Sequence, residues 1–202
     1  MAKVPVAGRV KTRLAADIGV AAAVRFARHC TAALLARVAY APWQMTIAVT
    51  PDSATHSRNW PHGLPLKPQR NGDLGARMQR IFDSTGPGPV VIIGTDVPQI
   101  ARAHLFRAFR LLGRHDAVFG PATDGGYWLV GLKRRPLVLR PFHGVRWSSP
   151  HALADTLANL GGRSVAHIDT LSDVDTAADI ARCAAVFGRR VRCPAAGLPA
   201  VK

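Results

Sequence analysis

The chain has 202 residues, enough to form one domain whose core needs no disulfide or metal to hold it together. Apolar residues make up 48% of it and charged residues 19%, which excludes a disordered protein. Its apolar runs are far shorter than the ~18 residues of a membrane helix, so we expect no membrane span. The early basic residues argue against a signal peptide, and three cysteines without a CxxC pair favour a reduced, cytoplasmic protein.

The charge of the chain is strongly unbalanced. Twenty-two arginines and five lysines against twelve aspartates give a formal net charge of +15, and glutamate is absent. Without glutamate, the chain cannot use an HExxH zinc motif or a glutamate pair for glycoside hydrolysis. A basic protein can bind nucleic acid, but these arginines are spread along the whole chain, and no helix-turn-helix or aromatic RNA-binding motif accompanies them. We therefore expect no specific nucleic-acid partner.

Hydrophobic periodicity and turn residues predict strands and helices that alternate along the chain. In chain order, the predicted elements are a helix at 20–38, a strand at 45–50, a helix at 74–83, a strand at 89–94, a helix at 101–112, strands at 116–119 and 127–132, a helix at 150–160, a strand at 164–168 and a helix at 175–187. We expect Ser149 to be the N-cap of the 150–160 helix, with Pro150 at its first position. The alternation predicts an α/β sheet with helices on both faces. Residues 1–188 would form one domain, and 189–202 a basic tail.

The strand at 89–94 carries the first candidate site residue. Its apolar core, Val-Val-Ile-Ile, predicts a strand buried on both faces. Asp96 follows directly, at the edge where open α/β sheets bind ligands, and a carboxylate there can hold a divalent cation. The alternative is an N-cap for the next helix, which Pro98 and the distance to that helix make less favourable.

Near the N-terminus, residues 3–14 combine glycine with closely spaced basic residues. Gly8 lets backbone N–H groups approach a phosphate, and Lys11 and Arg13 can neutralise its charge. The Walker pattern GxxxxGK[ST] is absent, so a solvated basic loop is the alternative.

Residues 69–78 form a glycine-rich turn that opens a helix. Asp73 lies near the N-terminus of this helix, where a carboxylate is a favourable cap. The functional alternative is a loop, with Gly72, Asp73 and Gly75, that wraps a base or a ribose.

Aspartates also gather in the second half of the chain. Asp124 lies in an Asp-Gly-Gly sequence that could be only a turn. Asp173, Asp175 and Asp179 crowd the start of the last predicted helix, and capping of the helix dipole explains one or two of them. A second metal ligand, from Asp173 or Asp175, would explain more.

Taken together and in order, these clusters resemble one bacterial protein family. The motifs that carry the resemblance are Lys3-x-Pro-x-x-Gly-x-Val-Lys-Thr-Arg-Leu14, Gly72-Asp-Leu-Gly-x-Arg-Met78, Gly94-Thr-Asp-x-Pro98, Gly120-Pro-Ala-x-Asp-Gly-Gly-Tyr127 and Asp173-Val-Asp-Thr176. The family comprises glycosyltransferase-A-type proteins, described as candidate nucleotide-diphospho-sugar transferases or as a domain of unknown function. The first motif also looks like a loop of phospholactate guanylyltransferases, and the general plan is similar to that of molybdenum-cofactor nucleotidyltransferases.

The resemblance implies a Rossmann-like, three-layer α/β/α fold of the nucleotide-diphospho-sugar transferase type, with a mostly parallel sheet. It implies that Asp96 is the main ligand of Mg²⁺ or Mn²⁺ and Asp175 the second ligand. It further implies that Asp124 and Lys11 are catalytic, with Asp124 the candidate base. The residues implied for nucleotide binding are Lys3, Gly8, Lys11, Thr12, Arg13, Gly72, Asp73 and Gly75.

The chain departs from the family pattern in two ways. Ala76, Thr123 and Ala178 stand where family members commonly carry glutamate, so no essential role is assigned to these positions. Family members also place an apolar strand before the first motif, whereas this sequence starts directly at the motif. We therefore expect either a first strand encoded upstream or a gap in the sheet.

The resemblance implies a transferase, and two reactions use the same residues. Glycosyl transfer from a nucleotide-diphospho-sugar to a small-molecule acceptor is favoured by the family. Nucleotidyl transfer, in which an acceptor phosphate attacks a nucleoside triphosphate and pyrophosphate leaves, suits the paired cations Lys11 and Arg13. A nucleotide-binding protein without catalytic activity is the third alternative.

Overall fold

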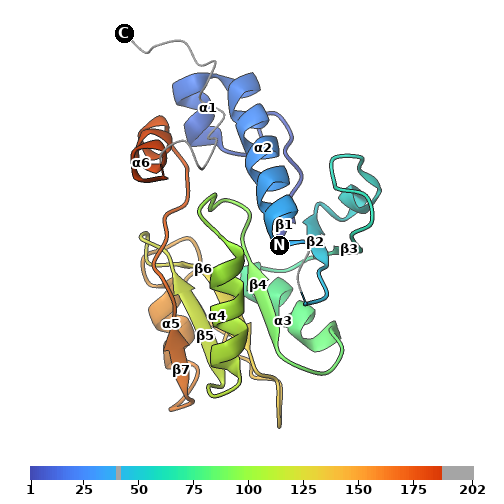
Figure 1. The fold of residues 1–202 in the computed structure, drawn as a ribbon, viewed down its shortest axis with the longest axis vertical. Coiled ribbons are helices and arrows are strands. Elements are labelled where there is room, and N and C mark those ends of the chain that lie inside the picture. Colours follow the sequence, from blue (N-terminus) through green and yellow to red (C-terminus); the bar gives the residue numbers. More distant parts are fainter. Residues whose placement is uncertain (40–41, 188–202) are drawn as a thin grey trace.

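The computed structural model describes residues 1–39 and 42–187, and its strands form two sheets rather than one (Figure 1). The predicted tail at 189–202 lies outside the described residues. The first sheet is fully parallel, with strand order β1-β2-β3. Its strands are β1 (Ala2–Lys3), β2 (Ile47–Thr50) and β3 (Leu66–Pro68).

The second sheet has four strands in the order β4-β6-β5-β7. They are β4 (Val90–Ile93), β5 (Ala117–Pro121), β6 (Tyr127–Leu132) and β7 (Val165–His167). Strand β6 is antiparallel to both of its neighbours, while β5 and β7 are parallel. Strands β4, β5 and β7 therefore run in one direction and end at the same edge of the sheet, which confirms a mostly parallel arrangement.

Helices cover both faces of this second sheet. These are α2 (Val20–Val38) and α4 (Arg102–Leu112) on one face and α3 (Leu74–Ser84) and α5 (Ala152–Ala158) on the other. The described residues also form α1 (Thr12–Ile18), α6 (Ala177–Phe187) and a 3₁₀ turn at Asp52–His56. Along β4, Val91 and Ile93 pack with α2 and α4, whereas Val90 and Ile92 pack with α3 and α5. Alternate residues of a strand point to opposite faces, so these two clusters are the two halves of a three-layer core. The predicted α/β/α architecture is confirmed.

Helices α1 and α6 pack together at one end of the molecule (Figure 1). Leu14 of α1 and Ile180 of α6 belong to one buried cluster, which also contains Phe26 of α2 and Val174. This packing brings the residues before α1 close to the residues before α6, although they lie at opposite ends of the sequence. In residues 1–39 and 42–187, no helix has the length and apolar character needed to cross a membrane.

The predicted helices at 20–38, 74–83 and 101–112 agree with α2, α3 and α4. The predicted N-cap at Ser149 is wrong, because α5 begins two residues later than expected and its N-cap is His151. The Ser149 hydroxyl instead donates to the Arg146 carbonyl and accepts from the His151 N–H within the preceding turn. The expected burial of β4 is also wrong, since only Ile92 of its four residues is fully buried.

Candidate functional site

Three segments meet at the edge where β4, β5 and β7 end. The Val174 N–H donates to the Asp96 carbonyl at 3.3 Å, joining the segment before α6 to the turn after β4. The Leu171 N–H donates to the Pro121 carbonyl, and the Thr123 N–H donates to the Leu171 carbonyl. The 171–174 segment therefore runs between two turns and holds the 94–98 and 122–126 segments together.

Lys11 enters this edge from the N-terminal segment. Its backbone is left-handed, with φ 49° and ψ 46°, at the N-cap of α1. Such a conformation costs a non-glycine residue about 1–2 kcal/mol, and strain of this kind is common at functional sites. The Lys11 Nζ atom lies 2.9 Å from Asp175 Oδ1 and 3.2 Å from Asp96 Oδ1. The fold thus brings together one residue from each of three motifs that the sequence singled out.

The charges of this cluster act on one another. Burial lowers the pKa of the Lys11 ammonium, but the carboxylates of Asp96 and Asp175 outweigh burial and raise it above its ordinary value. Burial raises the pKa of Asp173, and the nearby carboxylates of Asp175 and Asp124 raise it further. Asp96, Asp124, Asp173 and Asp175, with Lys11 among them, therefore form a local acidic centre. This centre stands out in a chain of net charge +15.

The three aspartates at the start of α6 have different roles. Asp179 Oδ2 accepts hydrogen bonds from the backbone N–H groups of Asp175 and Thr176 and from the Thr176 hydroxyl. Asp179 is therefore the helix cap, and its bonds fix the backbone from which the Asp175 side chain reaches Lys11. Capping explains Asp179, while Asp173 and Asp175 face the acidic centre.

The turn that contains Asp124 is held by its own hydrogen bonds and packs against the residues before α5. Asp124 Oδ1 accepts from the Gly126 N–H at 2.9 Å, and the Asp124 side chain is exposed. Gly125 has φ 84°, and a Cβ atom there would lie 2.2 Å from the Pro150 carbonyl oxygen. The Gly125 carbonyl also accepts from the Leu153 N–H, which anchors the first turn of α5. The turn thus supports α5 and presents Asp124 to the same edge as Asp96.

The other candidate binding residues of the first motif are exposed. Arg13 NH1 lies 3.8 Å from Asp175 Oδ2, and 79% of the Arg13 side chain is accessible to solvent. Gly8 has φ 72°, a left-handed conformation that favours glycine. Lys3 and Thr12 are exposed as well. The structure thus joins Lys11 and Arg13 to the acidic centre. The nucleotide-binding roles of these two residues and of Lys3, Gly8 and Thr12 stay predictions.

The motif at 72–78 has a local structural explanation. Asp73 is the N-cap of α3, because its Oδ1 atom accepts from the Ala76 N–H at 2.7 Å. A Cβ atom at Gly75 would lie 2.7 Å from the Phe142 carbonyl oxygen and 2.8 Å from the Trp147 ring, so glycine lets α3 pack against that loop. Gly72 has φ 114°, which favours glycine. The proposed contact of Gly72, Asp73 and Gly75 with a base or ribose stays a prediction.

The 69–78 segment begins with a buried polar residue to which the sequence analysis gave no role of its own. Gln69 is 4% exposed, and its Nε2 atom donates to the carbonyls of Ala2 and Ala48. It ties the end of β3 to β1 and β2. A glutamine beside a turn carries no periodicity or spacing signal, so only the structure could identify it.

The acidic centre has the donors for one hard cation. Within residues 1–39 and 42–187, no three His, Cys, Asp or Glu side chains are arranged to hold a metal ion by themselves. Asp96 and Asp175 are a pair, and Mg²⁺ often binds to one or two carboxylates while keeping its waters and substrate phosphates. The Lys11 ammonium lies between the two carboxylates and neutralises part of their charge.

The fold and its edge define a class: an α/β protein of the nucleotide-diphospho-sugar transferase type. The chain belongs to the family described as an uncharacterized protein conserved in bacteria (DUF2064), which residues 32–149 match. Among eight matching chains of solved structure is a candidate nucleotide-diphospho-sugar transferase from Desulfovibrio desulfuricans G20. It is 28% identical, with a TM-score of 0.87 over 96% of this chain and 90% of that chain. No curated protein matches the sequence.

Proposed function

We propose that this protein is a nucleotide-dependent transferase that moves a sugar from a nucleotide-diphospho-sugar to a small-molecule acceptor. The observation that carries the proposal is the contact of Lys11 with both Asp96 and Asp175 at the edge where β4 ends. Open α/β sheets bind nucleotides at this edge. The description of the Desulfovibrio desulfuricans protein supports the same reaction class.

The acidic centre suits a divalent cation that bridges protein and diphosphate. Asp96 and Asp175 would hold Mg²⁺ or Mn²⁺, which would neutralise charge on a departing nucleoside diphosphate. Asp96 has 65% of its side chain exposed and Asp175 38%, so both remain accessible to a ligand. Lys11, with its raised pKa, stays protonated at neutral pH and would move from the carboxylates to the phosphate oxygens.

Asp124 is the candidate base. One of its oxygens accepts from the Gly126 N–H, which orients the carboxylate and leaves the other oxygen for an acceptor hydroxyl. In an inverting transfer, Asp124 takes the hydroxyl proton and the acceptor oxygen bonds to the anomeric carbon. The bond from that carbon to the diphosphate oxygen breaks, and the nucleoside diphosphate leaves with the electron pair.

Nucleotidyl transfer is the second candidate, and the exposed side chain of Arg13 favours it. Arg13 lies beside Asp175 and is free to reach outward, and a triphosphate carries more charge to neutralise than a sugar diphosphate. In that reaction an acceptor phosphate would bond to the α-phosphorus, and pyrophosphate would leave.

A thermal-shift screen separates the two candidates. Nucleoside triphosphates and nucleotide sugars would be compared with and without Mg²⁺ or Mn²⁺. A ligand present at 100 times its dissociation constant adds roughly 2.7 kcal/mol of stability, an easily measured increase in melting temperature. Larger stabilisation by a nucleotide sugar than by the matching triphosphate supports glycosyl transfer, and the reverse supports nucleotidyl transfer. No stabilisation by either class contradicts both.

A further inference from the structure

One exposed helix face of the protein is strongly basic. Residues 97–115 contain four arginines and none of the twelve aspartates of the chain. Helix α4 occupies most of this segment and lies on the outside of the second sheet, onto which it packs with its buried side (Figure 1). The arginines lie on the exposed side of α4 and in the turn that follows it. We call this surface the basic face of α4; it consists of Arg102, Phe106, Arg107, Arg110 and Arg114.

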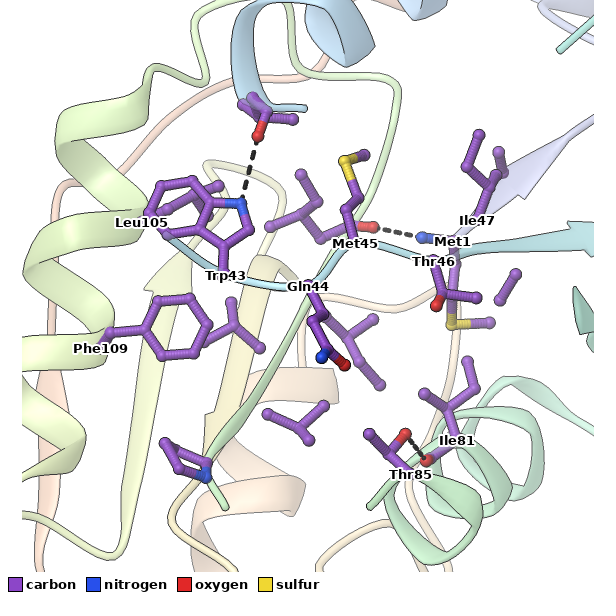
Figure 2. A pocket seen from close by; sticks show the side chains of 18 of the residues that line it. Met1, Trp43, Gln44, Met45, Thr46, Ile47, Ile81, Thr85, Leu105 and Phe109 are labelled. Atoms are coloured by element: carbon purple, nitrogen blue, oxygen red, sulfur yellow. Dashed lines mark hydrogen bonds between the residues drawn. The ribbon is translucent and has the colours of Figure 1, made fainter. Parts of the chain in front are cut away.

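The aromatic member of the basic face lies among the arginines. Phe106 is 48% exposed. It lies four residues from both Arg102 and Arg110, the spacing that places three helical side chains in one row. The Phe106 ring packs edge-on against Trp43, with ring centroids 5.0 Å apart. Figure 2 shows Trp43 beside Phe109 at one end of the apolar cavity between the sheets, where their rings stack at 5.7 Å. Aromatic packing therefore supports the Phe106 ring at the surface.

Most of the charge of the basic face is not compensated by acidic side chains. Arg107 pairs with Asp169 at 3.1 Å. Across residues 1–39 and 42–187, no carboxylate forms an ion pair with Arg102, Arg110 or Arg114. Arg102 is also the first residue of α4, where a cation opposes the helix dipole, and the first turn holds no acidic residue. The stability of the helix therefore does not explain the charge of Arg102.

We propose that the basic face of α4 docks the protein reversibly on the surface of a bilayer that contains anionic lipids. The arginines lie at the level of the lipid phosphates, and the Phe106 ring enters the boundary between head groups and acyl chains. A basic residue close to an anionic surface strengthens binding about fivefold, and four such residues strengthen it by a factor on the order of several hundred. This docking is independent of the reaction proposed above.

The exposed ring favours a bilayer over nucleic acid as the partner. Both partners offer phosphates to the arginines. The interface of a bilayer also has an apolar layer below its phosphates and commonly takes up aromatic side chains, whereas a duplex backbone has no such layer. Single-stranded nucleic acid is bound by several rings on which successive bases stack, and Phe106 is the one exposed ring of α4. A bilayer therefore matches both the charge and the apolar part of this face.

Vesicle sedimentation tests the proposal with the unsubstituted protein. Vesicles of phosphatidylcholine alone would be compared with vesicles in which about one third of the lipid is phosphatidylglycerol. We expect the anionic vesicles to bind the protein at least about tenfold more tightly. Raising the salt concentration from about 0.05 M to about 0.5 M should remove most of this difference. Equal binding to the two kinds of vesicle, or no binding to either, overturns the proposal.

A double variant tests whether α4 provides the docking face. Arg102→Gln combined with Arg110→Gln should weaken binding to the anionic vesicles at least about tenfold. The matched control combines Arg58→Gln with Lys67→Gln, which removes two exposed charges beside the first sheet and should weaken binding less than about threefold. All four side chains are exposed, so both double variants should keep their melting temperatures within about 2 °C. Equal losses of binding would mean that net charge alone attracts the protein, and would overturn the proposal.

Fluorescence gives a readout of insertion. Phe106→Trp places an indole in the row, and anionic vesicles with brominated acyl chains quench an indole that reaches those chains. We expect Phe106→Trp to be quenched more strongly than the unsubstituted protein. Leu137→Trp is the control, because Leu137 is also 48% exposed but lies in the loop after β6, and it should gain no quenching. Absence of added quenching in Phe106→Trp, or an equal gain in both variants, overturns the proposal.

A competition experiment distinguishes the bilayer from nucleic acid. Duplex and single-stranded DNA would be added to the protein on anionic vesicles, at matched concentrations of phosphate. We expect the vesicles to retain the protein. If DNA displaces it, and binds it in a manner that depends on Arg102 and Arg110, the partner is nucleic acid and the proposal is overturned.

Discussion

Lys11 Nζ lies 2.9 Å from Asp175 Oδ1, although the two residues are separated by 164 positions in the sequence. The contact rests on the packing of α1 against α6, since Leu14 and Ile180 share one buried cluster. A lysine that is 7% exposed and bonded to two carboxylates is held in one place. The candidate site therefore depends on three remote segments at once, and its residues can be tested one by one.

The first prediction concerns Asp96. Asp96→Asn keeps the size of the side chain and removes its charge, so we expect metal-dependent nucleotide binding to weaken at least about tenfold, the equivalent of 1.4 kcal/mol. The melting temperature without ligand should change by less than about 2 °C, because the Asp96 side chain is 65% exposed. Titration calorimetry with Mg²⁺ and a nucleotide sugar measures the binding.

Asp169 provides the control for that experiment. It also follows a strand of the second sheet, is 49% exposed and pairs with Arg107 at 3.1 Å. Asp169→Asn should leave metal-dependent binding unchanged. Equal losses in the two variants would mean that general electrostatics, rather than a site at Asp96, control binding. Unfolding of Asp96→Asn would show that Asp96 is a structural residue.

The second prediction separates the two reactions through Lys11 and Arg13. If the first motif binds pyrophosphate, Lys11→Ala and Arg13→Ala should weaken a nucleoside triphosphate several-fold more than the matching nucleotide sugar. Equal losses for the two ligands favour glycosyl transfer. Lys11→Ala should also lower stability without ligand, because Asp96 and Asp175 would then repel each other without a cation between them. If both variants bind both ligands as tightly as the unchanged protein does, Lys11 and Arg13 belong to a solvated basic loop without a role in binding.

Much of the fold could be predicted from the sequence, because local patterns determine its longer elements. Helix α2 repeats apolar residues at helical spacing, and its predicted and observed bounds agree at 20–38. The apolar runs of β4 and β6 likewise identified strands. Short elements were missed: β1 and β3 have two and three residues, too few to show a period of two.

Sequence motifs predicted which residues gather at the edge, but not how they pair. Asp96 was singled out from its position after a strand, whereas the residues alone left Asp173 and Asp175 as alternatives before the last helix, and the family resemblance favoured Asp175. The contact of Asp96 and Asp175 with Lys11 depends on the left-handed backbone of Lys11 and on the packing of α1 with α6, and neither leaves a sequence pattern. The sequence offered helix capping for Asp73 and for one or two of the aspartates before the last helix, and the hydrogen bonds of the structure assign it to Asp73 and Asp179.

The third prediction concerns Gly125, which combines a left-handed backbone with a close contact. Gly125→Ala should destabilise the protein by at least about 2 kcal/mol more than Gly63→Ala. Both glycines have φ 84°, but a Cβ atom at Gly125 would lie 2.2 Å from the Pro150 carbonyl oxygen, whereas a Cβ atom at Gly63 would meet nothing within 4 Å. Chemical denaturation of the two variants measures the difference. Equal losses of stability would mean that Pro150 can move away at little cost.

The last prediction concerns Asp179 and pH. Burial opposes ionisation of this carboxyl, but hydrogen bonds from Thr176, Asp175 and Arg182 outweigh burial and lower its pKa to about 2, against 3.8 in the unfolded chain. Because the folded state holds this group in its charged form, Asp179 contributes its full stability above about pH 4. The contribution is lost as the pH falls through 2, and it corresponds to roughly 2 kcal/mol.

Asp179→Asn should therefore lower the melting temperature at pH 7 by roughly 4–8 °C and flatten its dependence on pH between 4 and 2. Asp83 is the matched control, since its carboxylate contacts the exposed Arg140 guanidinium at 3.2 Å and accepts a hydrogen bond from the Gln79 amide at the surface. Asp83→Asn should change the melting temperature by less than about 2 °C. Because Asp179 holds the backbone of Asp175, Asp179→Asn should also weaken Mg²⁺-dependent nucleotide binding, while Asp83→Asn should not. A variant that loses stability but keeps full metal-dependent binding would show that Asp175 does not depend on the cap for its position.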